Sequence, residues 1–588
     1  ENGVEKLRRN QSKAAALKTI LEPAPRDYQS IVTLIERVDR ISAEDFHARL
    51  LEAIKNKMRK QPEVAAKYFS ALFYCGKKAP GNDLTLFLEL ADASSFEYPV
   101  KHEKVRDWIN TRLLGGKVKA KGTLDHDVFG NTCESATEKF DDVRTKSALG
   151  VVKLRSMARD AGCQHRYGTA GPESCLVGKE SRRRMKGSLE WLMDPARKGK
   201  TWDSVIRAAD CKEVLLAYTS EHPPDPPNLA MMFGGEAPGG DETARFEDCA
   251  ENVVGALRTL MARRSDLEIQ VFVLRKMDAA RTRVTSSGRY GAKHLISSAQ
   301  AWRLGCQNLP TIRIKDFDKD GKAQWRSPQL PFPMEVISTL NTTWSLVGQK
   351  PKAASLEIVN GSYLMPSRVK SLSSDDGVGL LLREEPLLLP VLDRAINAAT
   401  RNAAIPLTAL GQEQHARGRV FSGPKTYQRH LLVLPAILGL LLFRLNIRKE
   451  RYMTTAPYLV GRLLSLADQL HYHYSVNVRN KANTPREKLS VPPQLLGNAL
   501  MATALEEPVK ALALYAQRIL PYQAWARTTS GEEAGLARYF LSELGNVCSA
   551  VSLPEMPERC NDADKAQMLI GYLARPEKSD VLEKGAQA

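Results

Sequence analysis

The chain has 588 residues, of which 43% are hydrophobic and 26% charged, and its formal net charge is +18. This composition predicts a soluble globular protein of roughly three or four domains. The longest apolar run, 431–442, is well short of the roughly 18 residues that cross a bilayer, which excludes a membrane span. The excess of positive charge predicts a polyanionic partner.

The nine cysteines are scattered and form no CxxC pair. This pattern argues for a reducing compartment, so we predict a cytoplasmic protein without a disulfide framework. Cys163, His165 and Cys175 are the only cluster that resembles a set of metal ligands. Because a convincing fourth ligand and standard finger spacing are missing, we favour scattered thiols over a zinc site and predict no metal and no cofactor.

The positive charge is unevenly distributed along the chain. The segment from Arg451 to Ala588 holds 15 Lys and Arg against 14 Asp and Glu, whereas the preceding residues hold 70 against 53. We therefore expect nucleic-acid contacts upstream of Arg451, and mainly protein packing in the final segment.

The chain starts at Glu1 rather than Met, and we expect its natural start to be missing. Three apolar stripes with helical spacing follow before Lys60, and the third runs from Phe46 to Ile54. Residues 68–88 mix aromatic residues with glycine and proline, which fits either a hairpin or a helix-turn element. We predict a helical N-terminal segment over 1–110.

Residues 115–200 are predicted to be rich in loops and basic. Three lysines alternate from 117 to 121, so an extended segment presents them on one side. The turn signal at 127–131 and the region around 164 add amides, which can read base edges while cations hold phosphates. The alternative is a long solvated insertion. The predicted DNA-binding residues of this region are Lys117, Lys119, Lys121, Asn131, Gln164, Arg166, Arg182, Arg183, Arg184 and Lys186.

The stretch 266–310 reads as a strand, a basic connection and a helix. Apolar residues alternate from Leu267 to Val273, and a helical stripe runs from His294 to Trp302, after a Ser-Ser-Gly break at 286–288. The alternative to a site for polyanions is a surface loop whose arginines only solvate it. The predicted DNA-binding residues of the connection are Arg275, Lys276, Arg281 and Arg283.

The remaining elements continue this mixed pattern up to about residue 345. The Pro- and Gly-rich segment 221–242 predicts a linker or exposed loop, and a helix is expected over 246–261. A strand over 311–315 is followed by an Asp-rich turn at 316–321. This turn lacks the spacing and the closing Glu of a calcium loop.

From Pro386 onward the chain is predicted to be almost wholly helical. The 3.6-residue period marks a series of helices joined by short loops, which predicts a bundle. These helices are expected at 387–399, 425–443, 455–472, 493–505, 508–520, 532–548 and 565–574. We predict that a fragment from Met453 to Ala588 folds alone; the alternative is that it needs 431–442 to complete its core.

The fold prediction is therefore an α+β protein, with a mixed, loop-rich basic N-terminal part followed by a C-terminal α-helical bundle. The predicted parts are the helical segment 1–110, a basic mixed domain 111–345, a bridging region 346–424 and the bundle 425–588. GxxxxGK[ST], GxSxG and HExxH motifs are all absent from the sequence, and no catalytic constellation stands out. The missing nucleotide site favours a binding subunit over a motor, and we predict that the protein is not an enzyme.

Several blocks resemble the large subunit of type I CRISPR Cascade surveillance complexes, closest to subtype I-C. They are VFVLRKMDAARTRVTSSGRYGAKHLISSAQAWRLGCQNLP, HDVFGNTCESATEKF with LGVVKLRSMARDAGCQHRYG, and APYLVGRLLSLADQLHYHYS with PPQLLGNALM. Their order and spacing match that family over about two thirds of the chain.

The resemblance implies a subunit that contacts the protospacer-adjacent motif in duplex DNA and holds the displaced strand. It implies as partners a crRNA, target double-stranded DNA, the repeating backbone and foot subunits, small subunits, and a helicase-nuclease that the complex recruits. In such complexes the guide RNA supplies most of the sequence specificity by base pairing. Two alternatives stay open, namely a stand-alone nuclease and an RNA-binding scaffold protein.

Overall fold

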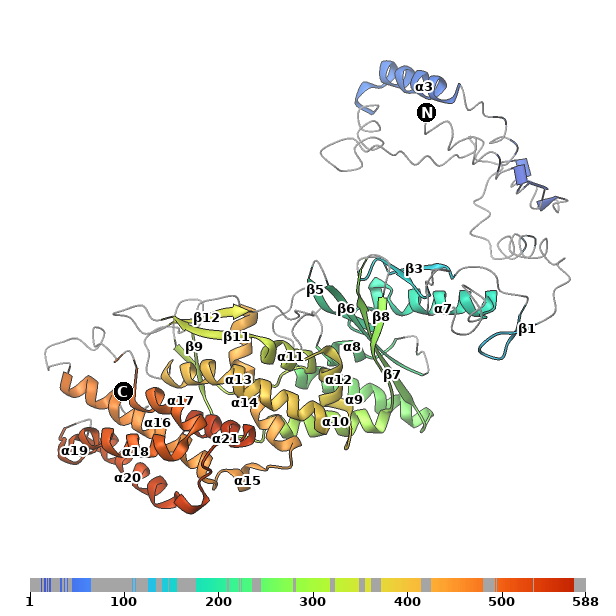
Figure 1. Ribbon diagram of the computed structural model, residues 1–588. Helices are drawn as coiled ribbons and strands as arrows, with labels where there is room; N and C mark the ends of the chain where they lie inside the picture. The colour runs from blue at the N-terminus through green and yellow to red at the C-terminus, as the bar shows by residue number, and fades with distance from the viewer. Residues whose placement is uncertain are drawn as a thin grey trace, which may run out of the picture. The chain divides into compact units, whose positions relative to one another are not determined.

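The computed structural model (Figure 1) describes single positions before residue 45, then residues 45–64, 108 and 112. From 125 to 575 it describes the chain apart from gaps at 134–139, 146–147, 156–175, 209–210, 221–222, 224, 235–244, 279–281, 318–322, 348–354, 361–371, 414–424, 480–491, 493 and 532–533. Among described residues 62% are helical and 15% lie in strands, and the helical region is C-terminal, which confirms the α+β prediction.

The chain divides into two compact units, Glu1–Asp125 and His126–Ala588. In the first unit, helix α3 (Phe46–Lys60) confirms the helix predicted from the third apolar stripe. Its last turn carries Lys57, Arg59 and Lys60, whose positive charges interact favourably with the negative end of the helix dipole. The short strand β1 (Asp125–His126) lies where the second unit begins.

The N-terminal part of the second unit is built on a four-stranded antiparallel sheet in the order β5-β6-β7-β8 (Figure 1). Alternate residues of its strands face two different cores, because side chains of a strand point to opposite faces. In β7, Val271 and Val273 face one core, and Phe272 and Leu274 face the other. The strands are β5 (Trp202–Ala208), β6 (Cys211–Thr219), β7 (Glu268–Lys276) and β8 (Thr282–Gly291).

The predicted break at 286–288 is wrong, because β8 continues through it and pairs with β7. The basic connection is therefore the end of a β-hairpin. Gly288 lies opposite Val271, and a Cβ at this position would come 2.5 Å from the Tyr290 ring. A side chain here would displace the end of the Tyr290 ring, so the Ser-Ser-Gly signal marks a closely packed strand position rather than a turn.

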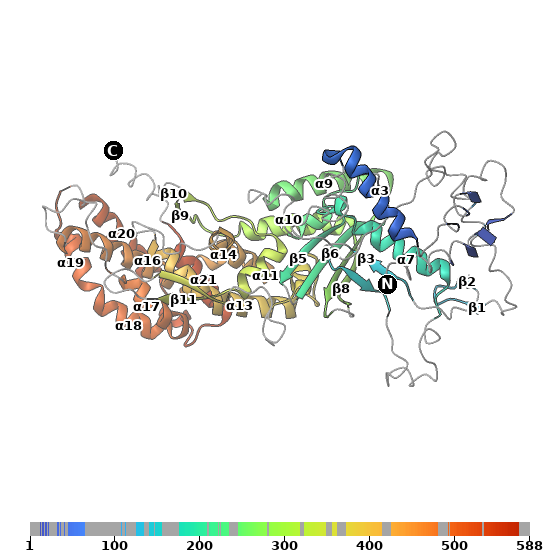
Figure 2. The same cartoon turned by 90° about the horizontal axis from the view of Figure 1, so that it is seen from above.

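One face of the sheet is covered by three helices, of which α9 and α10 are drawn beside it in Figure 2. They are α8 (Leu229–Met232), α9 (Phe246–Arg263) and α10 (Ala292–Cys306). Helices α9 and α10 confirm the two helices predicted from the periodicity of this region. Part of the predicted linker 221–242 is not exposed, however, since Leu229, Met232 and Phe233 are buried in this core. These three residues and Ala230, which is also buried, anchor the segment between its prolines and glycines.

The opposite face is covered by helix α7 (Lys179–Leu192) and a small hairpin of β3 (Asp142–Arg144) and β4 (Val151–Lys153). We call this group the basic subdomain. The arginine run around residue 183 was predicted to lie in loops, but the structure places it on α7. The helix forms because Leu189 and Leu192 pack on the second core while charged residues face outward.

Short elements connect the sheet to the bundle. The strand predicted at 311–315 corresponds to β9, which begins at Ile314 and ends at Phe317. It extends into the predicted Asp-rich turn because it pairs with β10. The connecting elements are β9 (Ile314–Phe317), β10 (Ala323–Arg326), α11 (Pro333–Asn341), β11 (Thr343–Val347), β12 (Ser355–Asn360) and α12 (Ser374–Leu382).

The C-terminal region is a bundle, as the periodicity predicts, with the two additional helices α15 and α19. Its helices are α13 (Leu389–Glu413), α14 (Lys425–Arg444), α15 (Lys449–Tyr452), α16 (Ala456–Tyr474), α17 (Leu496–Glu506), α18 (Pro508–Arg518), α19 (Leu520–Thr528), α20 (Ala534–Ala550) and α21 (Asp562–Leu573). No described helix is both long and apolar enough to cross a membrane.

One hydrophobic core extends from the sheet into the bundle, from Leu215 to Ala574. Helices α16 and α21 approach so closely that a Cβ at Gly461 would lie 2.0 Å from the carbonyl oxygen of Met568. Only glycine permits this approach. The mixed part and the bundle therefore share their packing.

A buried carboxyl lies at the centre of the bundle. Asp468 on α16 accepts hydrogen bonds from the Tyr572 hydroxyl (2.6 Å) and from the backbone amides of Gly497 (2.6 Å) and Asn498. Burial raises the pKa of Asp468 to about 7, although these hydrogen bonds favour the ionised form. Asp468 therefore joins α16, α17 and α21 through one titratable group.

We expect Asp468 to make stability depend on pH in the acidic range. An Asp in the unfolded chain loses its proton near pH ~3.9, whereas the folded protein keeps this proton until about pH 7. Between these values the unfolded state binds fewer protons, so stability falls as pH rises, by up to roughly 4 kcal/mol. Urea unfolding from pH 4 to 8 should show this slope in the wild type and not in Asp468→Asn; parallel curves would contradict it.

Candidate nucleic-acid interface

Helix α7 presents a stripe of cations on its outer side. Lys179, Arg183 and Lys186 are spaced i, i+4, i+7 and therefore share one face of the helix. Lys179 and Arg183 are exposed and Lys186 is half-buried. No ion pair joins any of them to a carboxylate in the described part of the chain. Among the described residues, this stripe can approach a polyanion without first breaking an ion pair.

The other two arginines of the run have different surroundings. Arg182 is buried, with 6% of its surface exposed, because it lies on the side of α7 that faces the protein. Arg184 is exposed and forms an ion pair with Glu180, one turn earlier, at 2.7 Å. Exposed pairs of this kind are worth only about 0.3–0.5 kcal/mol, so a phosphate can replace Glu180 at small cost. Arg184 thus remains available, whereas Arg182 does not.

The cations at the end of the β7–β8 hairpin also differ in their surroundings. Arg275 and Arg283 are opposite each other in the sheet. The Arg275 guanidinium lies 2.6 Å from Glu213, a wholly buried carboxylate that also accepts a hydrogen bond from Ser374. Arg283 is exposed. Arg275 therefore stabilises the sheet, and Arg283 is the cation that faces outward.

Lys276 ties the hairpin to the basic subdomain. Its ammonium group donates a hydrogen bond to the backbone carbonyl of Val151 in β4. On the neighbouring strand, Arg144 of β3 is paired with Val151, and its backbone amide donates a hydrogen bond to Glu190 of α7. These links hold α7 and the hairpin in one assembly, so the stripe and Arg283 belong to the same part of the molecule.

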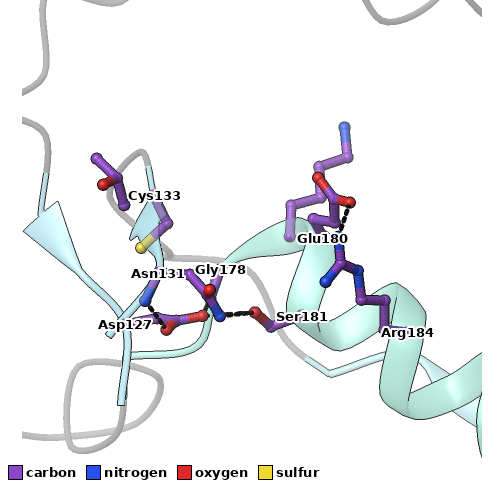
Figure 3. Close-up of a pocket in the computed structure, with 9 residues that line it drawn as sticks. Asp127, Asn131, Cys133, Gly178, Glu180, Ser181 and Arg184 are labelled. Atoms are coloured by element: carbon purple, nitrogen blue, oxygen red, sulfur yellow. Dashed lines mark hydrogen bonds and ion pairs between the residues drawn. The ribbon is translucent and has the colours of Figure 1, made fainter. Parts of the chain in front are cut away.

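A small pocket lies at the N-terminal end of α7 (Figure 3). It has a volume of about 240 Å³ and is bordered by the turn 127–131, strand β2 (Thr132–Cys133) and the first turns of α7. Asn131, one of the two amides predicted from the sequence, lies at this pocket together with Lys179 and Arg184. The structure thus brings together an amide and two cations that are about 50 residues apart in the chain.

Asp127 builds the pocket. One of its oxygens accepts hydrogen bonds from the backbone amides of Phe129 and Asn131, and the other accepts from the Ser181 hydroxyl at 2.6 Å and the Gly178 amide at 3.3 Å. The hydrogen bond from Ser181, supported by the backbone amides, lowers the pKa of Asp127 to about 2. The carboxylate is ionised at neutral pH and fastens the turn to the start of α7.

Several predicted residues lie outside the described residues, and nothing structural follows for them. They are Lys117, Lys119, Lys121, Gln164, Arg166 and Arg281, together with the cluster of Cys163, His165 and Cys175.

Sequence reasoning missed Lys179 and Ser181 at the pocket, and it missed Glu213 as the partner of Arg275. The apolar spacing of Met185, Leu189 and Leu192 was the available signal for α7. With that helix placed, Lys179 and Ser181 fall in its first turn. Nothing in the local sequence links Glu213 to Arg275, because the two residues meet only across a sheet.

Comparison of the sequence with protein families and with curated proteins identifies no relative. No family model matches the chain, and no curated protein matches it significantly.

Proposed function

We propose that this chain is the large, non-enzymatic subunit of an RNA-guided type I CRISPR interference complex, closest to subtype I-C, and that its basic subdomain contacts duplex DNA. Support comes from the sequence blocks that resemble this family and from the net charge of +18. In this role the chain contacts the protospacer-adjacent motif and the displaced strand, while the guide RNA reads the target.

One observation carries the proposal. The outer stripe of α7 ends at a pocket that holds an amide and one further cation, Arg184. Cations hold the phosphate backbone without reading sequence, and an amide beside them can contact a base edge. Lys179 belongs to both the stripe and the pocket. A surface with this arrangement fits duplex DNA better than it fits a small anion.

The partners follow from the same proposal. The crRNA and the backbone and foot subunits contact the chain, small subunits lie along its helical end, and a helicase-nuclease is recruited to the complex. The near-neutral charge of the last segment, from Arg451 onward, supports a protein-facing role for α16 to α21.

We expect the outward-facing cations to set the salt dependence of DNA binding. Changing Lys179, Arg183, Lys186 and Arg283 together to Ala removes up to four phosphate contacts. The slope of log K against log salt should then become less steep by up to about 3.6, since each contact with B-DNA contributes about 0.9. Fluorescence anisotropy with a labelled duplex at several salt concentrations measures this slope.

A matched control removes the same charge from the bundle. Arg518, Arg527, Arg538 and Arg559 are all exposed on its helices and loops, and changing them to Ala should leave the slope nearly unchanged. Equal effects of the two sets would show that net charge alone governs binding. Cleavage of DNA by the purified chain with Mg²⁺ would instead favour the nuclease, and binding confined to RNA would favour the scaffold protein.

A further inference from the structure

The hydroxyl of Ser181 has a single proton, and the structure shows where it goes. Ser181 Oγ lies 2.6 Å from Asp127 Oδ2. An ionised carboxylate can only accept hydrogen bonds, and Asp127 is ionised at neutral pH. The Ser181 proton is therefore donated to Asp127, and Ser181 Oγ can only accept from its other neighbour.

That neighbour is the side-chain amide of Asn131. Asn131 Nδ2 lies 3.3 Å from Ser181 Oγ, and Figure 3 shows the two groups facing each other. The reversed amide would place Oδ1 against Ser181 Oγ with no proton between the two oxygens, which is unfavourable. The chain from Asp127 through Ser181 thus fixes which end of the amide faces Ser181, and it leaves Oδ1 as the end free for another contact.

The amide oxygen is available at the pocket. No hydrogen bond within the described part of the chain uses Asn131 Oδ1, and the residue is exposed. Two cations and two carboxylates line the same pocket, and Arg184 is paired with Glu180. Lys179 forms no ion pair within the described part of the chain. The group that completes the pocket must therefore donate a hydrogen bond to Oδ1, and Lys179 favours a donor attached to an anionic molecule.

We propose that Asn131 Oδ1 accepts a hydrogen bond from the exocyclic amino group of a base, and that Ser181 and Asp127 are positioning residues for this contact. The proposal rests on the proposed function, in which the ligand is duplex DNA. Adenine and cytosine present amino groups in the major groove and guanine presents one in the minor groove, whereas thymine presents none. Thymine at the contacted position is thus disfavoured.

The DNA duplex for the test is obtained by selection, and single amino groups of its bases are then removed one at a time. The full chain is used to enrich a preferred sequence from a pool of short random duplexes. Each base of that duplex is then replaced in turn by the analogue that lacks its amino group: inosine for guanine, purine for adenine and pyrimidin-2-one for cytosine. At one position the loss of the amino group should weaken binding by the wild type about threefold to tenfold, the value of one hydrogen bond.

Three variants separate positioning from folding. Asn131→Ala should bind the selected duplex and the analogue duplex with equal affinity. That affinity should equal the affinity of the wild type for the analogue duplex. Ser181→Ala frees the amide to turn, so discrimination should fall towards onefold while affinity for the analogue probe is kept. Ser181→Thr restores the hydroxyl and should restore discrimination. A purely structural role of Ser181 would instead weaken both probes equally.

Two results would overturn the inference in different ways. If the wild type binds duplex DNA but tolerates every analogue, or if Ser181→Ala discriminates as the wild type does, the amide contact is wrong and DNA binding stands. If the full chain binds no duplex even at low salt, the proposed function fails together with the inference.

Discussion

Arg275→Ala is expected to lower the free energy of unfolding by about 3–5 kcal/mol, because it leaves a buried carboxylate without its cation. Glu213 has no exposed surface, and Arg275 has only 17% of its side chain exposed. Ser374 still donates a hydrogen bond to Glu213, but a hydroxyl cannot neutralise its charge. Urea unfolding followed by circular dichroism measures the loss.

The same hairpin offers a matched control. Arg289 of β8 pairs with Glu268 of β7 at 3.5 Å, and the two side chains are 67% and 41% exposed. Removing Arg289 should cost only about 0–1 kcal/mol, since solvent screens the pair. Comparable losses for the two arginines would contradict the assignment. A second check is Arg275→Met combined with Glu213→Leu, which should recover most of the stability, because no buried charge remains.

The second large effect concerns the isolated tail. We expect the fragment from Met453 to Ala588 to melt without cooperativity, since it lacks α13 and α14. Helix α21 is buried on all sides from Ala566 to Leu573, so it needs neighbours all around it. A fully buried Leu or Ile is worth about 1.5–3 kcal/mol, so exposing three or four of them costs about 4.5–12 kcal/mol. This cost is comparable with the ~5–15 kcal/mol that stabilises a whole domain.

Two hydrogen bonds show which upstream helix the fragment from Met453 lacks. Thr400 of α13 donates a hydrogen bond to Asp562 at 2.9 Å, and Asn498 of α17 donates to the Thr408 carbonyl of α13 at 3.0 Å. This packing favours the alternative that the tail needs upstream residues, and it adds α13 to the residues 431–442 considered from the sequence.

The test compares fragments that differ in their start. A fragment from Leu389 restores α13 and α14 and should melt cooperatively, whereas one from Lys425 restores only α14 and should recover part of the transition. Circular dichroism during heating measures all three fragments. A sharp transition of the shortest fragment would show that the tail folds alone, as the sequence analysis predicts.

Local sequence patterns were enough to predict one group of helices and strands. Helices α9, α14 and α16 lie close to their predicted limits, and strand β7 contains the predicted alternation. A helix or strand with one apolar face repeats its pattern within a few residues, so the pattern can be read without knowing the neighbours. The α+β class and the C-terminal bundle followed from the same signals.

Tertiary structure decided the elements whose partners are distant in the chain. Strand β8 passes through the Ser-Ser-Gly signal because β7 supplies its hydrogen bonds. Helix α7 hides its apolar side against a sheet, which a local reading of its arginines could not reveal. Strand pairing and burial depend on surfaces that the local sequence does not contain.

The candidate site shows the same division most clearly. Composition and spacing pointed to the cations, but only packing separated Arg182 from Arg183 and Arg275 from Arg283, although each pair looked equivalent in the sequence. Arg182 is buried and Arg275 is half-buried against Glu213, whereas Arg183 and Arg283 are exposed to solvent. The setting of Asn131 depends on Ser181, 50 residues away, because a side chain is oriented by its neighbours in space.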